Sequence, residues 1–470
     1  MSAFFESLQA VLNAMGASVM LPIVIFILGI ILGSKPGQAF RAGVTIGIAF
    51  IGINLVIGLM WGSLSGVSQA IVLKTGVTLD AVDVGWPTAS AIAFGSSVGT
   101  FIIPIAITVN IIMLVLGLTR TLNVDVWNFW HFAFVGTLVV VMTNNLVLGI
   151  ATAAVASALA LFIADWTAKG IQEFYGVPGI SITTASAQSF VPFIIPINWL
   201  LGKIPGVKDW KADPETIRKN WGVFGEPIIL GLVIGLVLGA IAYLPPQGDV
   251  TWTSGIITVL STGINLAAVM LLLPRMVQIL MEGLIPISEA ARDFMSKRAG
   301  SREINIGLDA AILIGHPSSI ATALLLVPIT IVLAIILPGN RMMPFADLAA
   351  IPFFVCMFAP ITRGNVARMT ILGTLAAIAG LYLASWMAPL QTMAAPIAGV
   401  AIPEGATLIT NMGDGWTTSA SYLSFPASFS SIAQWIWLVV WVVVIFILVK
   451  LFNKNKKSWS KLAGATYEEE

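Results

Sequence analysis

The chain has 470 residues, of which 58% are hydrophobic and only 10% are charged, and its mean hydropathy is +0.96. Soluble domains carry about 25% charged residues, so this composition excludes a soluble globular protein. The net charge is +1 and the basic residues lie beside apolar runs, which excludes an extended nucleic-acid-binding surface.

Apolar runs of about 20 residues, the length that a helix needs to cross a bilayer, predict an all-α polytopic membrane protein. The predicted spans are 12–33, 42–62, 101–118, 129–150, 226–244, 255–273, 321–337, 369–388 and 432–452. Shorter or proline-broken apolar pieces lie at 151–165, 190–202 and 347–361, and segments rich in glycine and hydroxyl groups at 86–100, 176–189, 308–320 and 396–430. Such pieces are typical of re-entrant hairpins, so we expect about 11 transmembrane helices plus hairpins.

The basic residues predict the orientation of the chain in the membrane. The first eleven residues contain no Lys or Arg, whereas Lys35 and Arg41 follow the first predicted span. The N-terminus is therefore expected outside the cell. Basic residues also gather within 203–219, 292–302 and 454–461, which places these segments and the C-terminus in the cytoplasm.

Short motifs recur in the two halves of the chain, in the same order and at a similar offset. The matched pairs are Ile27–Gly33 with Val233–Gly239, Gly52–Leu55 with Gly263–Leu266, Ala91–Gly95 with Ala311–Gly315, and Arg120 and Asp125 with Arg341 and Asp347. Gly52-Ile-Asn-Leu55 recurs letter for letter. These matches predict an internal duplication.

The charge pattern predicts that the two halves are inverted. The first half opens with a span that runs from outside to inside, and the span 226–244 runs from a basic loop to the outside. We therefore expect a first repeat at 1–202, a cytoplasmic linker at 203–225, a second repeat at 226–425, and a final helix with a basic tail at 426–470. Inverted repeats with broken helices are typical of alternating-access carriers.

Asp309 lies inside an apolar segment, where an ionisable residue is a functional candidate because its burial in a bilayer costs several kcal/mol. His316 follows seven residues later, which places both side chains on one face if the segment is helical. They would then share one substrate cavity, and a structural Asp–His pair or a helix cap is the alternative. A metal ion would need further ligands that the chain does not offer, so no metal is expected.

Other polar candidates lie in or beside the predicted breaks. His131 follows two tryptophans at the mouth of a span, and an interfacial aromatic belt explains this cluster equally well. Asp83 and Trp86 precede a polar segment that matches the position of the Asp309 hairpin, and the Trp86 ring either stacks on a sugar or marks a turn. Gln188 ends the run 181–188, whose hydroxyl and amide groups suit a polyhydroxylated solute.

The chain has no Gly-x-x-x-x-Gly-Lys-Ser/Thr loop, so its energy source is expected to be an ion gradient or another protein. Cys356 lies in an apolar run and is interpreted as a small buried hydrophobic residue. No residue is typical of a phosphate carrier. We therefore expect neither a phosphorylation site nor a cofactor on this chain.

Several motifs, spread over almost the whole chain, carry a resemblance to a known family. They are Val82–Pro87, Trp127–His131, Gly225–Pro227, Leu273–Arg275, Ile306–Asp309 with Gly315 and His316, Pro338–Asn340 and Arg363–Asn365. Together they resemble the galactitol-type membrane component (IIC) of the bacterial phosphoenolpyruvate-dependent sugar phosphotransferase system. A more distant resemblance, around Asp309, is to the ascorbate-type IIC components of the same superfamily. The chain departs from the galactitol type at 182–186, where a His-Gly-Thr pattern is expected.

The resemblance implies a homodimer in the lipid of the bacterial cytoplasmic (inner) membrane. A V-motif-like scaffold would include the two Gly-Ile-Asn-Leu spans, and a mobile core with two re-entrant hairpins would carry galactitol or a related alditol by an elevator-like movement. A separate IIB protein would phosphorylate the sugar through a phosphocysteine that IIA charges. Carried over position by position, the substrate contacts are Trp86, His131, Thr184, Asp309, His316 and Asn365.

Two alternatives remain open. An ion-coupled secondary transporter of a polyol fits the inverted repeat equally well, with Asp309 as the group that takes up a proton. An ascorbate-type IIC component is the other alternative. Phosphotransfer requires the soluble partners and releases a phosphorylated product, whereas proton coupling predicts uptake that an uncoupler abolishes in vesicles without those partners.

Overall fold

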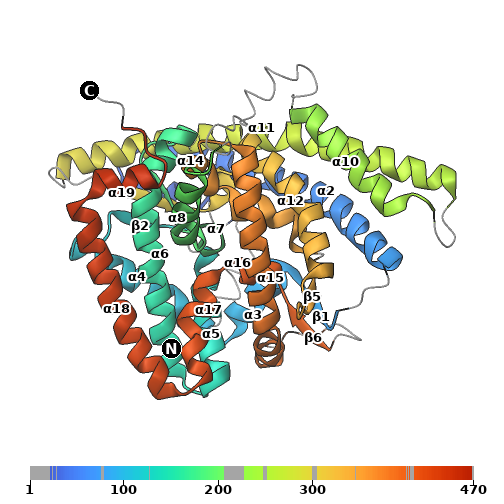
Figure 1. Ribbon diagram of the computed structural model, residues 1–470. Coiled ribbons are helices and arrows are strands. Elements are labelled where there is room, and N and C mark those ends of the chain that lie inside the picture. Colours follow the sequence, from blue (N-terminus) through green and yellow to red (C-terminus); the bar gives the residue numbers. More distant parts are fainter. Residues whose placement is uncertain are drawn as a thin grey trace.

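The computed structural model describes residues 19–467, with gaps at 20–21, 24, 28, 76–78, 126, 206–226, 247–250, 299–303, 345, 399, 401 and 403–406. Figure 1 shows long helices packed side by side, with short strands between them. The predicted first span, 12–33, lies partly outside the described residues, and the predicted linker, 203–225, lies almost entirely outside them.

The elements fall into the two halves of the chain and a C-terminal pair of helices. The first half contains α2 (Pro36–Thr75), β1 (Ala81–Asp83), α3 (Gly85–Gly95), α4 (Gly99–Val115), β2 (Thr121–Asn123), η1 (Trp127–Phe129), α5 (Trp130–Thr143), α6 (Leu146–Tyr175), β3 (Ile180–Ile182), α7 (Ala185–Gln188) and α8 (Val191–Leu201). The second half contains α10 (Pro227–Tyr243), α11 (Trp252–Arg298), β4 (Asn305–Leu308), η3 (Ala310–Ile312), α12 (Pro317–Ile336), β5 (Met342–Met343), η4 (Asp347–Ala350), α13 (Ile351–Val355), α14 (Phe358–Thr362), α15 (Val366–Ile397), β6 (Leu408–Thr410), α16 (Met412–Trp416), α17 (Thr418–Ser424) and η5 (Phe425–Ser428). The chain continues into α18 (Ser431–Lys454) and α19 (Lys456–Leu462).

Among the described residues, 6 helices are long and apolar enough to cross a membrane. They are α2, α6, α11, α12, α15 and α18. The pair α3 and α4 passes the same test but bends by 85°, as expected of a broken span or re-entrant loop at 86–100. The predicted class, a helical multi-pass membrane protein, is confirmed, whereas the number of crossings stays a prediction.

The predicted span 129–150 is not one helix. α5 ends before Asn144, whose backbone is left-handed (φ 51°), and Asn145 caps the start of α6 by accepting a hydrogen bond from the Leu148 N–H (3.0 Å). The predicted apolar piece 151–165 therefore lies inside the 30-residue helix α6. Hydropathy missed this break because the residues on both sides of the two asparagines are equally apolar.

Two small parallel sheets connect the halves of the chain. Sheet A has the order β5-β1-β6 and sheet B has the order β2-β4-β3. In each sheet the central strand comes from one half of the chain, and both of its neighbours come from the other half. The two orders become identical when β1, β2 and β3 are exchanged for β4, β5 and β6.

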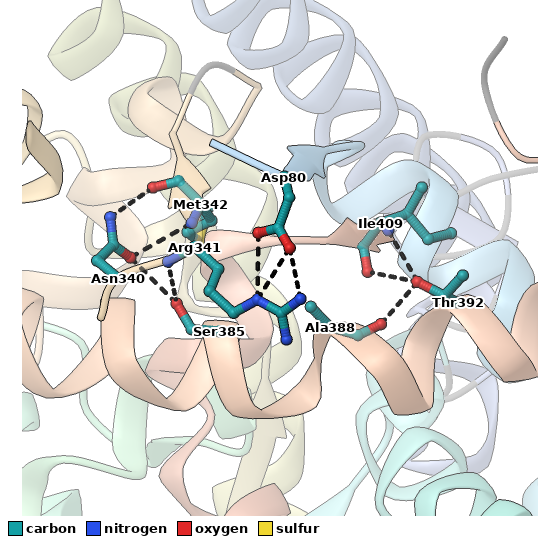
Figure 2. A network of polar contacts seen from close by, with 8 residues as sticks. All are labelled: Asp80, Asn340, Arg341, Met342, Ser385, Ala388, Thr392 and Ile409. Atoms are coloured by element: carbon teal, nitrogen blue, oxygen red, sulfur yellow. Dashed lines mark hydrogen bonds and ion pairs between the residues drawn. The ribbon is translucent and has the colours of Figure 1, made fainter. Parts of the chain in front are cut away.

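Helix α15 anchors sheet A, as Figure 2 shows. The Ser385 hydroxyl accepts a hydrogen bond from the backbone N–H of Arg341, directly before β5 (3.0 Å). The Thr392 hydroxyl accepts from the backbone N–H of Ile409 in β6 (2.8 Å). Two strands of the sheet are thereby held on the surface of one helix.

Helix α6 anchors sheet B in a similar way. The Asp165 carboxylate accepts hydrogen bonds from the backbone N–H of Arg120, directly before β2 (3.0 Å), and from the Thr121 hydroxyl (2.8 Å). Asp165 on α6 thus has the same relation to Arg120 as Ser385 on α15 has to Arg341. Both anchors lie at the amino ends of strands, which leaves the carboxyl ends to present other side chains.

Arg341 also forms an ion pair with Asp80, directly before β1 (Figure 2). Hydrogen bonds from the guanidinium group lower the pKa of Asp80 below its ordinary value of 3.8. A carboxyl group whose pKa is lower in the folded state stabilises the fold at pH values above its unfolded-state pKa. This stabilisation is lost as the pH falls through the folded-state pKa.

We expect Asp80→Asn to cost about 0.5 kcal/mol at pH 7, because the two side chains are 41% and 43% exposed. The difference in Tm between the wild type and the variant should disappear as the pH falls from about 5 to about 2. Thermal unfolding of the purified protein over this range checks the prediction. A difference that persisted at the acidic end would come from packing instead of the ion pair.

Helices α2, α10 and α11 pack against one another on one side of the molecule (Figure 1). A Cβ atom on Gly235 of α10 would lie 2.7 Å from the Cα atom of Gly263 of α11, so only glycine permits this close approach. Asn265 of α11 donates a hydrogen bond to the Ser63 hydroxyl of α2 (3.1 Å). The glycine-mediated packing of α10 and α11 therefore occurs within one protomer, and it includes Gly263–Leu266 of α11. The other Gly-Ile-Asn-Leu segment, Gly52–Leu55, lies on α2, which packs against both helices.

Candidate functional site

The carboxyl ends of the three strands of sheet B converge on one group of polar side chains. Parallel strands end at the same edge of a sheet, so residues that follow β2, β3 and β4 meet there although they are far apart in sequence. Five of these residues are buried and Asp309 is partly buried. We call them the sheet B cluster, which consists of Asp125, Asn128, His131, Thr184, Ser186 and Asp309.

Asn128 joins two carboxyl groups that come from different halves of the chain. Its Nδ2 donates hydrogen bonds to Oδ2 of Asp125 and to Oδ2 of Asp309, each at 2.7 Å. Oδ1 of Asp309 accepts a hydrogen bond from the backbone N–H of Ala311 (2.8 Å), so Asp309 caps the short turn η3. The Asp309 carboxylate is fixed in direction, the residue is only partly buried, and the carboxylate can accept a hydrogen bond from a hydroxyl-bearing ligand.

His131 lies in the first turn of α5, with its ring stacked on Trp130 at 3.8 Å. Nδ1 lies 3.0 Å from the carbonyl oxygen of Asn128, and Nε2 lies 3.2 Å from the Ser186 hydroxyl. A carbonyl oxygen only accepts, so Nδ1 carries the proton and Nε2 of the neutral ring accepts from Ser186. Both rings are buried within the protein, which favours a site residue over an interfacial aromatic belt.

Thr184 connects the end of β3 with the turn after β4. Its hydroxyl oxygen accepts a hydrogen bond from the backbone N–H of Ala310 (2.9 Å), next to Asp309. Two residues further on, Ser186 lies in the short helix α7 and faces His131. The cluster thus presents two carboxyl groups, an amide, an imidazole and two hydroxyls in fixed positions.

Asp83 and Trp86 lie at the carboxyl end of sheet A. The carboxylate of Asp83 accepts hydrogen bonds from three backbone N–H groups, those of Gly85 (3.1 Å), Ala346 (3.0 Å) and Asp347 (3.2 Å). The backbone N–H of Trp86 donates to Oδ1 of Asp347 (2.9 Å), and its ring is 39% exposed. Asp83 ends the central strand of its sheet, as Asp309 follows the central strand of the other sheet.

The EIIC-GAT family model, described as "PTS system sugar-specific permease component", matches residues 10–405. The chain belongs to this family. A "Putative permease IIC component" from Escherichia coli K12 is 40% identical over 411 residues, which cover 86% of this chain and 92% of that protein. A "PTS system galactitol-specific EIIC component" of the same strain, and one from Escherichia coli O157:H7, are each 38% identical over 412 residues, 88% of both chains.

Family membership and the apolar helices together make this permease component a multi-pass protein of the bacterial inner membrane. A sugar-specific permease component of the phosphotransferase system takes a sugar or alditol and works with IIA and IIB proteins. The predicted resemblance is therefore confirmed at the level of the family.

Three residues that the sequence predicted for the site, Gln188, Asn365 and His316, lie outside the sheet B cluster. Gln188 is buried. When the oxygen and nitrogen of its amide are exchanged so that both find suitable partners, the nitrogen donates hydrogen bonds to the carbonyl oxygens of Ile182 (3.3 Å) and Ala160 (3.2 Å). Asn365 caps α15 by accepting a hydrogen bond from the Arg368 N–H (3.0 Å). The contacts described for these side chains are to the protein backbone.

His316 caps α12 by accepting a hydrogen bond from the Ser318 N–H (3.2 Å), and its ring packs against Phe174 at 4.7 Å. The segment from Asp309 to His316 is not a continuous helix, since each of the two residues caps a separate element. The two side chains therefore do not share one helical face. Each side chain forms a capping hydrogen bond, as the helix-cap alternative predicts, and Asp309 in addition belongs to the sheet B cluster.

Asp125 and Asn128 were not predicted as site residues from the sequence, and Ser186 was predicted only as one hydroxyl of the run 181–188. Asp125 was present only as a matched residue of the internal duplication, and Asn128 only as a neighbour of two tryptophans. Nothing in the local sequence shows that Asn128 contacts Asp309, because the two residues are 181 positions apart.

Proposed function

We propose that this permease carries galactitol or a related alditol, and that the sheet B cluster binds it. The observation that carries the proposal is the convergence of fixed donors and acceptors from both halves of the chain on Asp309. A polyol has many hydroxyl groups and no charge, so its recognition needs such groups in fixed directions. The two relatives named as galactitol-specific components support the alditol class.

Binding of galactitol, other alditols, hexoses and ascorbate to the purified protein in detergent tests this proposal. Selective binding of alditols is the expected result. An ascorbate-type component is the second candidate, because the departure from the galactitol-type pattern falls on Thr184 and Ser186, both in the sheet B cluster. Binding of ascorbate alone would favour that candidate, and binding of hexoses alone would contradict both.

We further propose that 1–202 and 226–425 form an inverted repeat. The exchangeable strand orders of the two sheets support it, and so do the matched anchors at Arg120 and Arg341. The short helices α7 and α16, which follow corresponding strands, contact each other. Next to this contact, the hydroxyls of Ser189 and Ser419 lie 3.0 Å apart.

In the proposed elevator-like movement, α2, α10 and α11 form the scaffold and the two sheets belong to the mobile core. The scaffold contains both Gly-Ile-Asn-Leu segments and, in the described residues, meets the core mainly through η3, η4 and α12. Exposed apolar side chains such as Phe40, Ile48 and Val237 line the scaffold helices. A second copy of the chain and membrane lipid are the proposed neighbours of these surfaces.

Basic residues gather at one end of the molecule. The end of α8, the junction of α14 and α15, and α19 with its tail meet there, because Asn198 donates to the Ile361 carbonyl of α14 (3.0 Å) and Gly464 packs on the Pro360 carbonyl of the same helix. Basic residues of these segments are Lys203, Arg363, Arg368, Lys457 and Lys461. We assign this end and the C-terminus to the cytoplasm, and the N-terminus to the outside.

The phosphoryl donor in this proposal is the phosphocysteine of a separate IIB protein, recharged by IIA. Cys356 is a free, fully buried thiol and is therefore not accessible to IIA. Uptake into vesicles distinguishes this mechanism from an ion-coupled carrier. Phosphorylated product that appears only with IIA and IIB supports phosphotransfer, whereas uptake without them that an uncoupler abolishes would support proton coupling.

We expect Trp86→Ala to weaken alditol binding about fivefold, or about 1 kcal/mol, through loss of stacking on the sugar. The partly exposed ring is available to a ligand, and the hydrogen bond to Asp347 survives because it comes from the backbone. Trp437→Ala in α18, where the indole donates to the Tyr422 carbonyl (2.7 Å), is the control and should leave affinity unchanged. Equal losses in both variants would assign Trp86 to packing.

A further inference from the structure

A second cluster of carboxyl groups lies at the carboxyl end of sheet A, and none of these carboxyl groups belongs to the sheet B cluster. Asp83, Asp347 and Asp414 come from β1, η4 and α16 and are 6%, 0% and 0% exposed. They are neighbours, because Asp347 accepts a hydrogen bond from the backbone N–H of Gly413 (2.9 Å), the residue before Asp414. A membrane protein rarely buries three acidic groups together without a function.

The hydrogen-bond donors are distributed unequally among the three groups. Asp83 accepts from three backbone N–H groups, and Asp347 accepts from two. Asp414 differs, since only Oδ2 accepts a hydrogen bond of good geometry, from Nε2 of Gln391 in α15 (3.0 Å), and Oδ1 accepts none. The Asn411 amide is the other side-chain donor group beside this carboxyl group, and its Nδ2 forms no hydrogen bond of good geometry either. Burial of an ionised oxygen with no donor is costly, so the ionised form of Asp414 is the least favourable of the three.

The side chain that meets Asp414 has an unpaired atom of its own. Oε1 of Gln391 is buried and has no hydrogen-bond partner, although Gln391 is 0% exposed. The amide cannot be reversed without loss of the hydrogen bond from Nε2 to Asp414. A carboxyl group and an amide face each other here with one hydrogen bond formed and with one unpaired oxygen on each side.

No positive charge is available to neutralise Asp414 among the described residues. The charged groups that act on it are Asp347 and Asp83, both acidic. The other elements packed against α16 are α3, α7, α15 and α17, and their only charged residue, Arg368, precedes Gln391 by 23 positions on α15, or about 35 Å along the helix. The described residues also include no group of three or more side chains suited to a metal ion.

We propose that Asp414 is a proton-binding site. A proton on Oδ1 makes the carboxyl neutral and allows Oδ1 to donate to Oε1 of Gln391, while Nε2 continues to donate to Oδ2. The acid and the amide then form a closed pair with two hydrogen bonds, and both unpaired oxygens are satisfied. The pair joins α16 to α15, so loss of the proton weakens this junction. This inference does not depend on the identity of the sugar.

Asp414→Asn tests the proposal, because an Asn–Gln pair forms the same two hydrogen bonds at every pH. We expect the Tm of the wild type in detergent to fall as the pH rises above about 4, the ordinary pKa of an aspartate, because the folded state holds this proton more tightly than the unfolded state does. In Asp414→Asn this fall should be smaller, and at high pH the variant should melt above the wild type. Asp347→Asn, which removes an acceptor of backbone N–H groups, should instead destabilise the protein at every pH.

Infrared spectra of protein labelled with ¹³C-aspartate give a second readout. The carbonyl band of a protonated carboxylic acid should be present in the wild type at neutral pH and reduced in Asp414→Asn. An unchanged band, an unchanged pH profile, or failure of Asp414→Asn to fold would each overturn the proposal. A higher Tm of the wild type in Na⁺ than in choline, at constant ionic strength, would also overturn the proposal if Asp414→Asn lost this difference. Such a result would assign a metal cation to the site instead of a proton.

Discussion

Asp309→Asn is expected to weaken alditol binding at least tenfold, which corresponds to about 1.4 kcal/mol. Both oxygens of Asp309 accept from fixed donors, Asn128 Nδ2 and the Ala311 N–H. An asparagine must direct its own NH₂ group at one of these donors, which turns one attractive contact into a repulsive one. The variant also loses the charge-assisted hydrogen bond that a carboxylate forms with a substrate hydroxyl. Isothermal titration with galactitol measures the effect.

Asp165→Asn is the matched control for this experiment. Asp165 is a buried aspartate on α6 that anchors sheet B, but it binds Arg120 and Thr121 at the amino end of β2, away from the cluster. If Asp309 contacts the sugar, affinity falls in Asp309→Asn and stays near the wild-type value in Asp165→Asn. Equal losses would show that damage to the sheet causes the effect, and normal binding by a folded Asp309→Asn would remove Asp309 from the site.

Hydropathy was sufficient to predict the class of the protein and the position of most long helices. It failed at Asn144 and Asn145, because a helix break in a uniformly apolar stretch depends on two capping residues. It also did not predict the two sheets. Strands of two to four residues are too short for an alternating pattern, and their pairing joins segments up to 327 positions apart, such as Ala81 and Leu408.

The candidate site was only partly predictable for a related reason. Asp309 and His131 could be selected because an ionisable residue in an apolar segment is unusual. Asn128 and Ser186 are ordinary polar residues, and their roles depend on contacts between strands that are distant in sequence. Asp414 lies in a segment that was predicted only as rich in glycine and hydroxyl groups, and its unpaired oxygen is a property of the fold alone.

The second large effect is expected for Gly415→Ala in α16. A Cβ atom at this position would lie 2.1 Å from the carbonyl oxygen of Gly380 in α15 and 3.0 Å from the Cβ atom of Ala384. The first contact is with backbone, which cannot rotate away, so the two helices must separate. We expect a loss of about 1–3 kcal/mol in the free energy of unfolding, measured as a lower Tm of the purified protein.

Gly62→Ala in α2 distinguishes this packing effect from a general effect of alanine. Gly62 also lies within a helix, but a Cβ atom there would meet no atom within 4 Å. Alanine is the better helix former by about 1 kcal/mol, so this variant should be as stable as the wild type or more stable. Opposite shifts in the two variants would show that α15 and α16 need backbone contact at Gly380. That contact also keeps Asp414 against Gln391, so Gly415→Ala should reduce the pH dependence of Tm together with its value.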